Sequence, residues 1–165
     1  MTNRCEKLVR NAERILRTRQ IATYWKIPND LRLTADAVVF GERGPCDFIG
    51  HTARGVSLLI EAKGTVAPRL AVPHNRGIKG HQWMALRDAD AANAIAIIAW
   101  LNKDRFCALS FKRAKQLLGD RKSIPWPDGH SLAGLKDEDA TIVVVGAIVT
   151  CIETHCDSVQ TFGHA

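Results

Sequence analysis

Three charged side chains flank a short apolar hairpin at residues 46–64, where a buried sheet would be built from Val, Ile and Leu. Asp47 stands at the head of the first strand, and Glu61 and Lys63 lie near the end of the second. A three-residue hairpin loop that ends in Gly55 is favoured, because glycine readily adopts the left-handed conformation that the last position needs. This loop predicts a register in which Asp47 lies opposite Glu61. Strand alternation then places Lys63 on the same face.

Two carboxylates on neighbouring strands repel each other unless a cation lies between them. Mg²⁺ suits such a position, since it takes oxygen ligands and is commonly held by one or two carboxylates together with substrate phosphates. A lysine beside the site can position or help deprotonate an attacking water and can stabilise charge on a phosphate. The alternative is that Lys63 neutralises Asp47 or Glu61 in a solvated ion pair of little energetic effect.

The rest of the chain must supply the elements that position this hairpin. Apolar residues recur at helical spacing over residues 6–19, and the continuous apolar run at residues 94–101 is typical of a buried central strand. The order of the predicted elements along the chain, a helix, then several strands, then mixed helices and strands, favours an α/β or α+β arrangement with helices on a mixed sheet. Further patterns predict strands at 36–40, 46–51, 56–64, 105–109 and 142–150, helices at 81–93 and 111–120, and a basic loop at 66–80.

Length and composition indicate one domain. A chain of 165 residues that is 46% hydrophobic can bury one sizeable core, so we predict a single domain over residues 1–165. Residues 151–165 could form a flexible tail. The cysteines and histidines of that tail lack the paired spacing of a strong zinc site.

Charge and cysteine content bear on the partner and the compartment. The chain has 23 Lys and Arg against 17 Asp and Glu, a formal charge of +6, which is compatible with a polyanionic partner such as DNA. Five cysteines do not form the even framework of a small secreted protein, and the charged N-terminus lacks the apolar core of a signal peptide. No apolar run is long enough to span a membrane. We therefore expect a cytoplasmic protein with reduced cysteines and no membrane partner.

Basic residues near the hairpin and further along the chain are candidates for gripping DNA phosphates on both sides of the site. For any one of them, an ordinary solvated surface residue is the alternative. The candidates are Arg4, Lys26, Arg69, Arg76, Lys79, Lys112, Arg113 and Lys122.

Asp47, the hairpin, Glu61 and Lys63 together resemble the core of the PD-(D/E)XK nuclease superfamily. Within that superfamily the chain is most similar to the RecU-type Holliday junction resolvases. The similarity extends over roughly residues 3–126, in the family's order and approximate spacing. The motifs that carry it are NRCEKLV, YWKIP, DFIG, EAKGT, HQWMAL and KSIPW.

The resemblance implies an α/β, restriction-endonuclease-like fold, with a mixed β-sheet flanked by helices. It implies a Mg²⁺-dependent, structure-selective endodeoxyribonuclease, in which Mn²⁺ can substitute, that resolves four-way DNA junctions through a metal-activated water and acts as a homodimer. Lys63 would assist the attacking water, and Gln82 would line the pocket. The implied metal ligands are Asp47, Glu61, Glu6 and the backbone carbonyl of Ala62.

Some assignments stay open under this resemblance. Glu13 lies two turns from Glu6 at nearly the same helix angle, so either could complete the acidic cluster, and each could instead be an ordinary solvated helix residue. Gln82 could likewise be a helix-surface residue. The family's extended insertion is shortened here to residues 31–45, which leaves junction selectivity open. The alternatives are a related nuclease that acts on linear, nicked or flap DNA, and a non-catalytic DNA-binding module that retains the fold.

Overall fold

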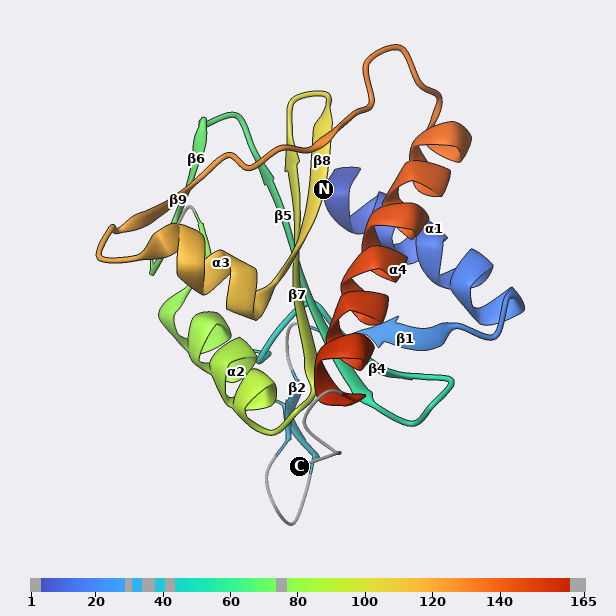
Figure 1. Cartoon of the computed structure of the whole chain (residues 1–165), viewed down its shortest axis with the longest axis vertical. Coiled ribbons are helices and arrows are strands. Elements are labelled where there is room, and N and C mark those ends of the chain that lie inside the picture. The colour runs from blue at the N-terminus through green and yellow to red at the C-terminus, as the bar shows by residue number, and fades with distance from the viewer. Residues whose placement is uncertain (1–3, 29–30, 34–37, 41–43, 74–76, 161–165) are drawn as a thin grey trace.

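A six-stranded mixed sheet forms the centre of the computed structural model, which describes residues 4–28, 31–33, 38–40, 44–73 and 77–160 (Figure 1). β5 and β7 are parallel, and the other neighbouring pairs in this sheet are antiparallel. The strands, in spatial order, are β1 (Ala22–Lys26), β4 (Phe48–Thr52), β5 (Ser57–Thr65), β7 (Ile95–Asn102), β8 (Arg105–Ser110) and β10 (His130–Ser131).

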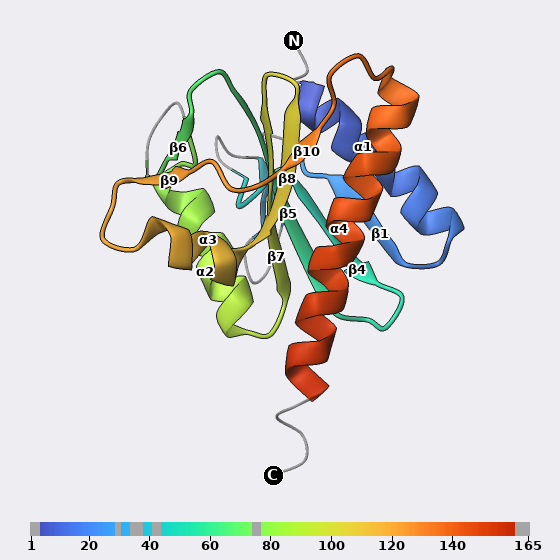
Figure 2. The same cartoon turned by 45° about the horizontal axis from the view of Figure 1, so that its top comes forward.

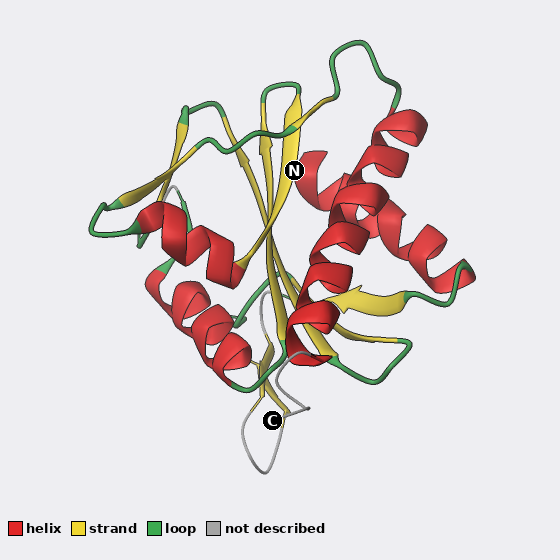
Figure 3. Cartoon of the chain, viewed as in Figure 1, coloured by secondary structure: helices red, strands yellow, loops and turns green. Residues whose placement is uncertain are grey.

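Helices cover both faces of this sheet (Figures 1 and 2). α1 (Arg4–Thr18) and α4 (Asp137–Gln160) pack on one face, and α2 (Gly80–Ala91) and α3 (Phe111–Leu118) pack on the other. Two short ribbons accompany them: β2 (Leu31–Leu33) with β3 (Val38–Phe40), and β6 (Arg69–Ala71) with β9 (Ser123–Pro125). Over the described residues, the predicted α/β fold with a mixed sheet flanked by helices is confirmed, and it is compatible with a restriction-endonuclease-like architecture (Figure 3).

Strand β7 separates two apolar cores. Ile95, Ile97 and Ala99 pack toward α1 and α4, whereas Ile98 and Trp100 pack toward α2 and α3. Both faces of the strand are therefore covered by helices. This double coverage is the reason that the strand reads as one continuous apolar run instead of alternating with polar residues.

The hairpin between β4 and β5 has the predicted register. His51 pairs with Ser57, and Ile49 pairs with Leu59. Gly55 closes the loop in the left-handed conformation that the prediction requires, with φ of 77°. Because the register holds along the whole ladder, residues 47 and 61 are brought to the same level of the sheet.

One predicted element is wrong: residues 142–150, predicted as a strand, lie within α4. A short apolar run fits a buried helix as well as a strand, so periodicity alone does not decide. Ala140, Val144 and Ile148 recur every four residues on the buried side, and three acidic residues in the first turn favour a helix N-terminus. The helix also continues through residues 151–160 of the predicted tail, and residues 161–165 lie outside the described residues.

The sequence patterns do not predict β1 or β6. β1 follows α1 directly, and its alternating residues Ala22 and Tyr24 are buried against that helix. Tyr24 Oη donates a hydrogen bond to Val9 O on α1 at 2.7 Å. β6 lies inside the predicted loop at residues 66–80 and pairs with β9, more than fifty residues further along the chain.

Two predictions about the environment can be compared with the structure. Among the described helices, none has the length and apolar content needed to cross a membrane. Cys5, Cys46, Cys107 and Cys151 are buried, and none of these four described residues forms a disulfide. Cytoplasmic location stays a prediction.

We expect Gly50→Ala to destabilise the protein. A Cβ at this position would lie 2.0 Å from Thr23 O and 2.5 Å from Tyr24 Cα on β1. A rotamer change cannot relieve overlap with backbone atoms, so the pairing of β1 with β4 must shift, at a cost of about 3 kcal/mol. Urea denaturation measures this loss in the free energy of unfolding.

Gly146→Ala on α4 is the matched control, because a Cβ there meets only open space. We expect it to be neutral or to stabilise the helix by up to about 1 kcal/mol. Equal destabilisation by the two substitutions would contradict the steric account.

Candidate active site

Asp47 lies where the pairing of β4 with β5 stops. The ladder ends one residue pair short of Asp47 and Glu61, because the chain bends before β4 begins. Ala62 N therefore donates its hydrogen bond to Asp47 Oδ2, at 2.9 Å, and not to a backbone carbonyl of the neighbouring strand. On the other side, Asp47 O accepts a hydrogen bond from Ile27 N at 2.9 Å. Contacts to the ends of both neighbouring strands thus fix the aspartate.

The carbonyl of Ala62 faces the same gap. In an extended strand, the N–H and C=O groups of one residue point to the same side. Since Ala62 N points to Asp47, the carbonyl of Ala62 also points toward the edge of β5 that β4 leaves uncovered. This is the position that the resemblance predicts for a backbone ligand.

Glu61 is fully buried beside this edge, on the face of the sheet that α2 and α3 cover. Lys63 Nζ lies 2.5 Å from Glu61 Oε1 in an ion pair, and Asp47 is the second side chain that contacts the glutamate carboxyl group. Burial raises the pKa of Glu61 to about 8; the negative charge of Asp47 adds to the rise, and the Lys63 ammonium opposes it. The alternative of a solvated ion pair does not apply, because the glutamate has no access to solvent.

The two carboxylates carry more negative charge than Lys63 can balance. Burial also raises the pKa of Asp47, while the hydrogen bond from Ala62 N and the Lys63 ammonium act in the opposite direction. When both acids are ionised, two negative charges face one positive charge in a space with little water. A buried charge deficit of this kind is satisfied by a proton or by a metal cation.

The residues present fit a cation of the Mg²⁺ type. Asp47, Glu61 and the Ala62 carbonyl supply only oxygen, the ligand atom that Mg²⁺ prefers, and one or two carboxylates are its usual protein ligands. Apart from Lys63, the charged side chain beside the Glu61 carboxyl group is another acid, Asp47, so a cation between the two acids would be strongly stabilised. Cys46, between Pro45 and Asp47, is buried and donates its thiol to Phe48 O at 3.1 Å.

Glu6, the fourth predicted ligand, is engaged elsewhere. Its Oε2 forms a short ion pair with Lys26 Nζ at the end of β1. Both groups act on Asp47: the charge of Glu6 raises the pKa of Asp47, and that of Lys26 lowers it. Within the described part of the chain, no three Asp, Glu, His or Cys side chains form a group that could hold a metal ion.

Glu13, the alternative to Glu6, lies away from the cluster. It is seven residues further along α1, about 10 Å of helix rise. Its carboxylate pairs with Arg17 at 3.3 Å. The structure therefore brings Glu6, and not Glu13, to the end of the helix nearer Asp47.

Gln82 is buried on α2, the helix that packs over the same face as Glu61. Its Oε1 accepts a hydrogen bond from Lys79 N at 3.1 Å, which satisfies one of the exposed N–H groups at the start of the helix. The predicted surface alternative is therefore wrong, and the side chain has a structural role in holding the N-terminus of α2.

The predicted DNA-binding residues are spread over several surfaces. Arg4 pairs with Asp104 and Asp137, and Arg69 is held by Ser123. Lys79 and Lys122 are exposed, and Arg76 lies outside the described residues.

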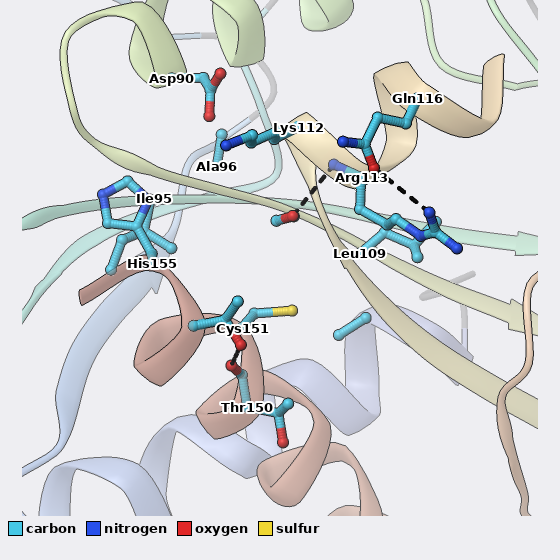
Figure 4. Close-up of a pocket in the computed structure, with 13 residues that line it drawn as sticks. Asp90, Ile95, Ala96, Leu109, Lys112, Arg113, Gln116, Thr150, Cys151 and His155 are labelled. Atoms are coloured by element: carbon cyan, nitrogen blue, oxygen red, sulfur yellow. Dashed lines mark hydrogen bonds between the residues drawn. The ribbon is translucent and has the colours of Figure 1, made fainter. Parts of the chain in front are cut away.

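Lys112 and Arg113 lie on a different pocket, of about 400 Å³, between α3, α4 and the start of β7 (Figure 4). Its lining includes Cys151 and His155, and none of the predicted catalytic residues. These two cations are therefore separated from the acidic site.

The sequence reasoning misses a basic stretch at the turn between β7 and β8, which contains Lys103 and Arg105. Both side chains are exposed at the end of the sheet where β5 finishes. The signal was present in the sequence, since the turn follows the buried strand directly. The sequence does not show how far this turn lies from the hairpin, because that distance depends on the parallel pairing of β5 with β7.

Comparison with protein-family models and with curated proteins finds no match to this chain.

We expect Glu61→Gln to stabilise the metal-free protein at alkaline pH. The ordinary pKa of about 4.5 applies to the unfolded chain, and the folded value is about 8, so the folded state keeps a proton that the unfolded state releases. Stability contributed by this group is thus present below pH 4.5 and is lost as the pH rises toward 8. Glutamine does not ionise, so the variant should exceed the wild type at pH 8 by about 4 kcal/mol.

Urea denaturation in EDTA at pH 5 and pH 8 measures the difference. Glu153→Gln, exposed on α4, is the control and should change stability little at either pH. If the advantage of Glu61→Gln does not grow with pH, Glu61 is not the buried, raised acid described above.

Proposed function

We propose that the protein is a Mg²⁺-dependent, structure-selective endodeoxyribonuclease that resolves four-way DNA junctions by hydrolysing phosphodiester bonds. The observation that carries the proposal is the grouping of a fully buried carboxylate, Glu61, with the partly buried Asp47 and with Lys63 on one hairpin. Lys63 offsets only one of the two negative charges that ionised Asp47 and Glu61 would carry, so a bound cation would complete the charge balance. Binding a catalytic cation is a function that the donor set fits.

The chain's own residues have distinct tasks in this proposal. Asp47, Glu61 and the Ala62 carbonyl would hold Mg²⁺, for which Mn²⁺ can substitute. When bound, the ion supplies positive charge that stabilises the phosphate and lowers the pKa of water. Lys63, held by Glu61, donates a hydrogen bond that orients the attacking water or a phosphate oxygen. The water oxygen bonds to phosphorus, the bond to the leaving sugar oxygen breaks, and the proton lost by the water is returned to that oxygen.

DNA as the substrate and a homodimer as the active form are supported by charge and by the resemblance to RecU-type resolvases. The net charge of +6 favours a polyanionic substrate. A four-way junction needs two symmetry-related cuts, and an isologous dimer places two identical sites in a fixed relation.

A related nuclease that acts on linear, nicked or flap DNA is the second candidate. The observation that favours it is the short connection between β1 and β4, residues 27–47, where the resolvases carry an extended insertion. A non-catalytic DNA-binding module is the third, and the intact set of Asp47, Glu61 and Lys63 argues against it.

We expect Asp47→Asn, Glu61→Gln and Lys63→Ala each to bind DNA but to cut it at least about 100-fold more slowly, because each removes a group that acts on the reacting phosphate or its cation. Cleavage of labelled synthetic junctions during a Mg²⁺ titration measures this loss. Glu13→Gln is the matched control on α1 and should retain wild-type activity. Unchanged cleavage by Asp47→Asn would reject the assigned site.

Junction selectivity has its own test. We expect the wild type to cut a four-way junction faster than a linear duplex of the same sequence at the same salt concentration, since phosphate affinity alone is salt-dependent and does not distinguish the two. Equal rates would favour the linear-duplex candidate. If neither Mg²⁺ nor Mn²⁺ yields product from DNA that is bound, the protein is a binding module.

A further inference from the structure

A groove lies at the end of the sheet where β5 and β7 finish. Two adjoining hollows of about 580 and about 600 Å³ form it, and Val66 and Lys103 line both. One wall begins at Gly64, the residue that follows Lys63 on β5, and the opposite wall is the turn between β7 and β8. The groove therefore continues directly from the strand that carries the candidate active site.

The charge of the groove is positive. Its cations are Arg69, Lys103 and Arg105, and none of the three forms an ion pair with an acid in the described part of the chain. The lining contains one acid, Asp104, whose charge is offset by Arg4 at 3.4 Å. The three cations are thus available to an external anion.

Neighbouring side chains hold two of these cations in place. Arg69 Nε donates to Ser123 Oγ at 2.7 Å, and its Nη2 donates to Ser123 O at 2.9 Å, which leaves further N–H donors of the same guanidinium unused. The guanidinium of Arg105 lies over the ring of Trp126, 5.6 Å from the ring centre. Such positioning lowers the entropy lost when an anion binds.

The walls of the groove are joined to each other and to the active site. Asn102 Nδ2 donates to Ala67 O at 2.7 Å, which ties the turn after β7 to the segment after β5. Lys63 pairs with Trp100 across the parallel ladder, and the ring centres of Trp100 and Trp126 lie 4.4 Å apart. The position of Arg105 is therefore coupled by direct contacts to the strand that holds Lys63.

We infer that this groove binds the sugar-phosphate backbone of the DNA strand that is cut, on one side of the scissile phosphate. The inference rests on the proposed nuclease function and adds Lys103 and Arg105 to the residues that bind substrate. Arg69 lines one hollow of the groove, Arg105 lines the other, and Lys103 borders both. Cations spread along a groove in this way suit an extended chain of phosphates better than one small anion. By contrast, Lys112 and Arg113 border the pocket at the start of β7, about 23 Å away along the strand.

The test is fluorescence anisotropy with the full chain and a labelled four-way junction, in Ca²⁺ to limit cleavage, over about 50 to about 200 mM salt. We expect the double variant Lys103→Asn, Arg105→Gln to bind about tenfold more weakly and to lower the slope of log Kd against log salt by about 2, because two phosphate contacts are lost. Asparagine suits position 103, where φ is 51°. The control Arg10→Gln, Arg14→Gln removes the same charge from exposed positions on α1 and should keep the wild-type slope.

The outcomes separate the inference from the function on which it rests. If the wild type binds DNA and the groove variant keeps its affinity and slope, the inference is overturned while the nuclease proposal stands. If the wild type binds no DNA at all, both fall. If circular dichroism shows that the double variant melts at a lower temperature than the wild type, the single variant Lys103→Asn replaces it. We then expect the slope of log Kd against log salt to fall by about 1. An unchanged slope overturns the inference.

Discussion

Full burial of the Glu61 carboxylate is the constraint on which the rest of the site depends. Isolated from water, an ionised glutamate is unfavourable unless positive charge is supplied, and Lys63 provides only part of what two acids require. The same strand position on an ordinary sheet would hold an apolar residue, as its ladder partner Ile98 does on β7. Glu61 thus lowers the stability of the fold locally, and destabilising residues of this kind are characteristic of functional positions.

Local chemistry explains the part of this arrangement that could be predicted. A glycine at position 55 selects the loop, the loop selects the register, and the register places Asp47 level with Glu61, so the pairing follows from fewer than twenty consecutive residues. The detail of the contact does not follow in the same way. If β4 continued in register, Ala62 N would meet Cys46 O. Because the chain bends before β4 begins, Ala62 N meets the Asp47 side chain instead, while Asp47 O accepts from Ile27 N.

Distant pairings explain the part that could not be predicted. Glu6 and Glu13 are nearly equivalent on a helical wheel, and tertiary contacts distinguish them, because Glu6 meets Lys26 at the end of an unpredicted edge strand whereas Glu13 pairs with Arg17 on its own helix. The apolar run at residues 142–150 has the length of a buried strand, and part of its helical signal lies before it, in the acidic first turn and in Ala140, which packs with Val144 and Ile148 in the core. The sequence likewise does not show which basic residues lie near one another, because the parallel pairing of β5 with β7 decides which of them share an end of the sheet.

The buried thiol of Cys46 has a consequence for which metals the site can accept. Burial, and then the charges of Glu61 and Asp47, raise the pKa of Cys46 to about 12, so the sulfur stays protonated although it neighbours the candidate ligands. Thiolates select soft, thiophilic ions, whereas carboxylate and carbonyl oxygens select hard ones. Because this thiol is buried and donates to Phe48 O, the donors that the site presents are the oxygen atoms of Asp47, Glu61 and Ala62, and such a set selects hard ions over soft ones.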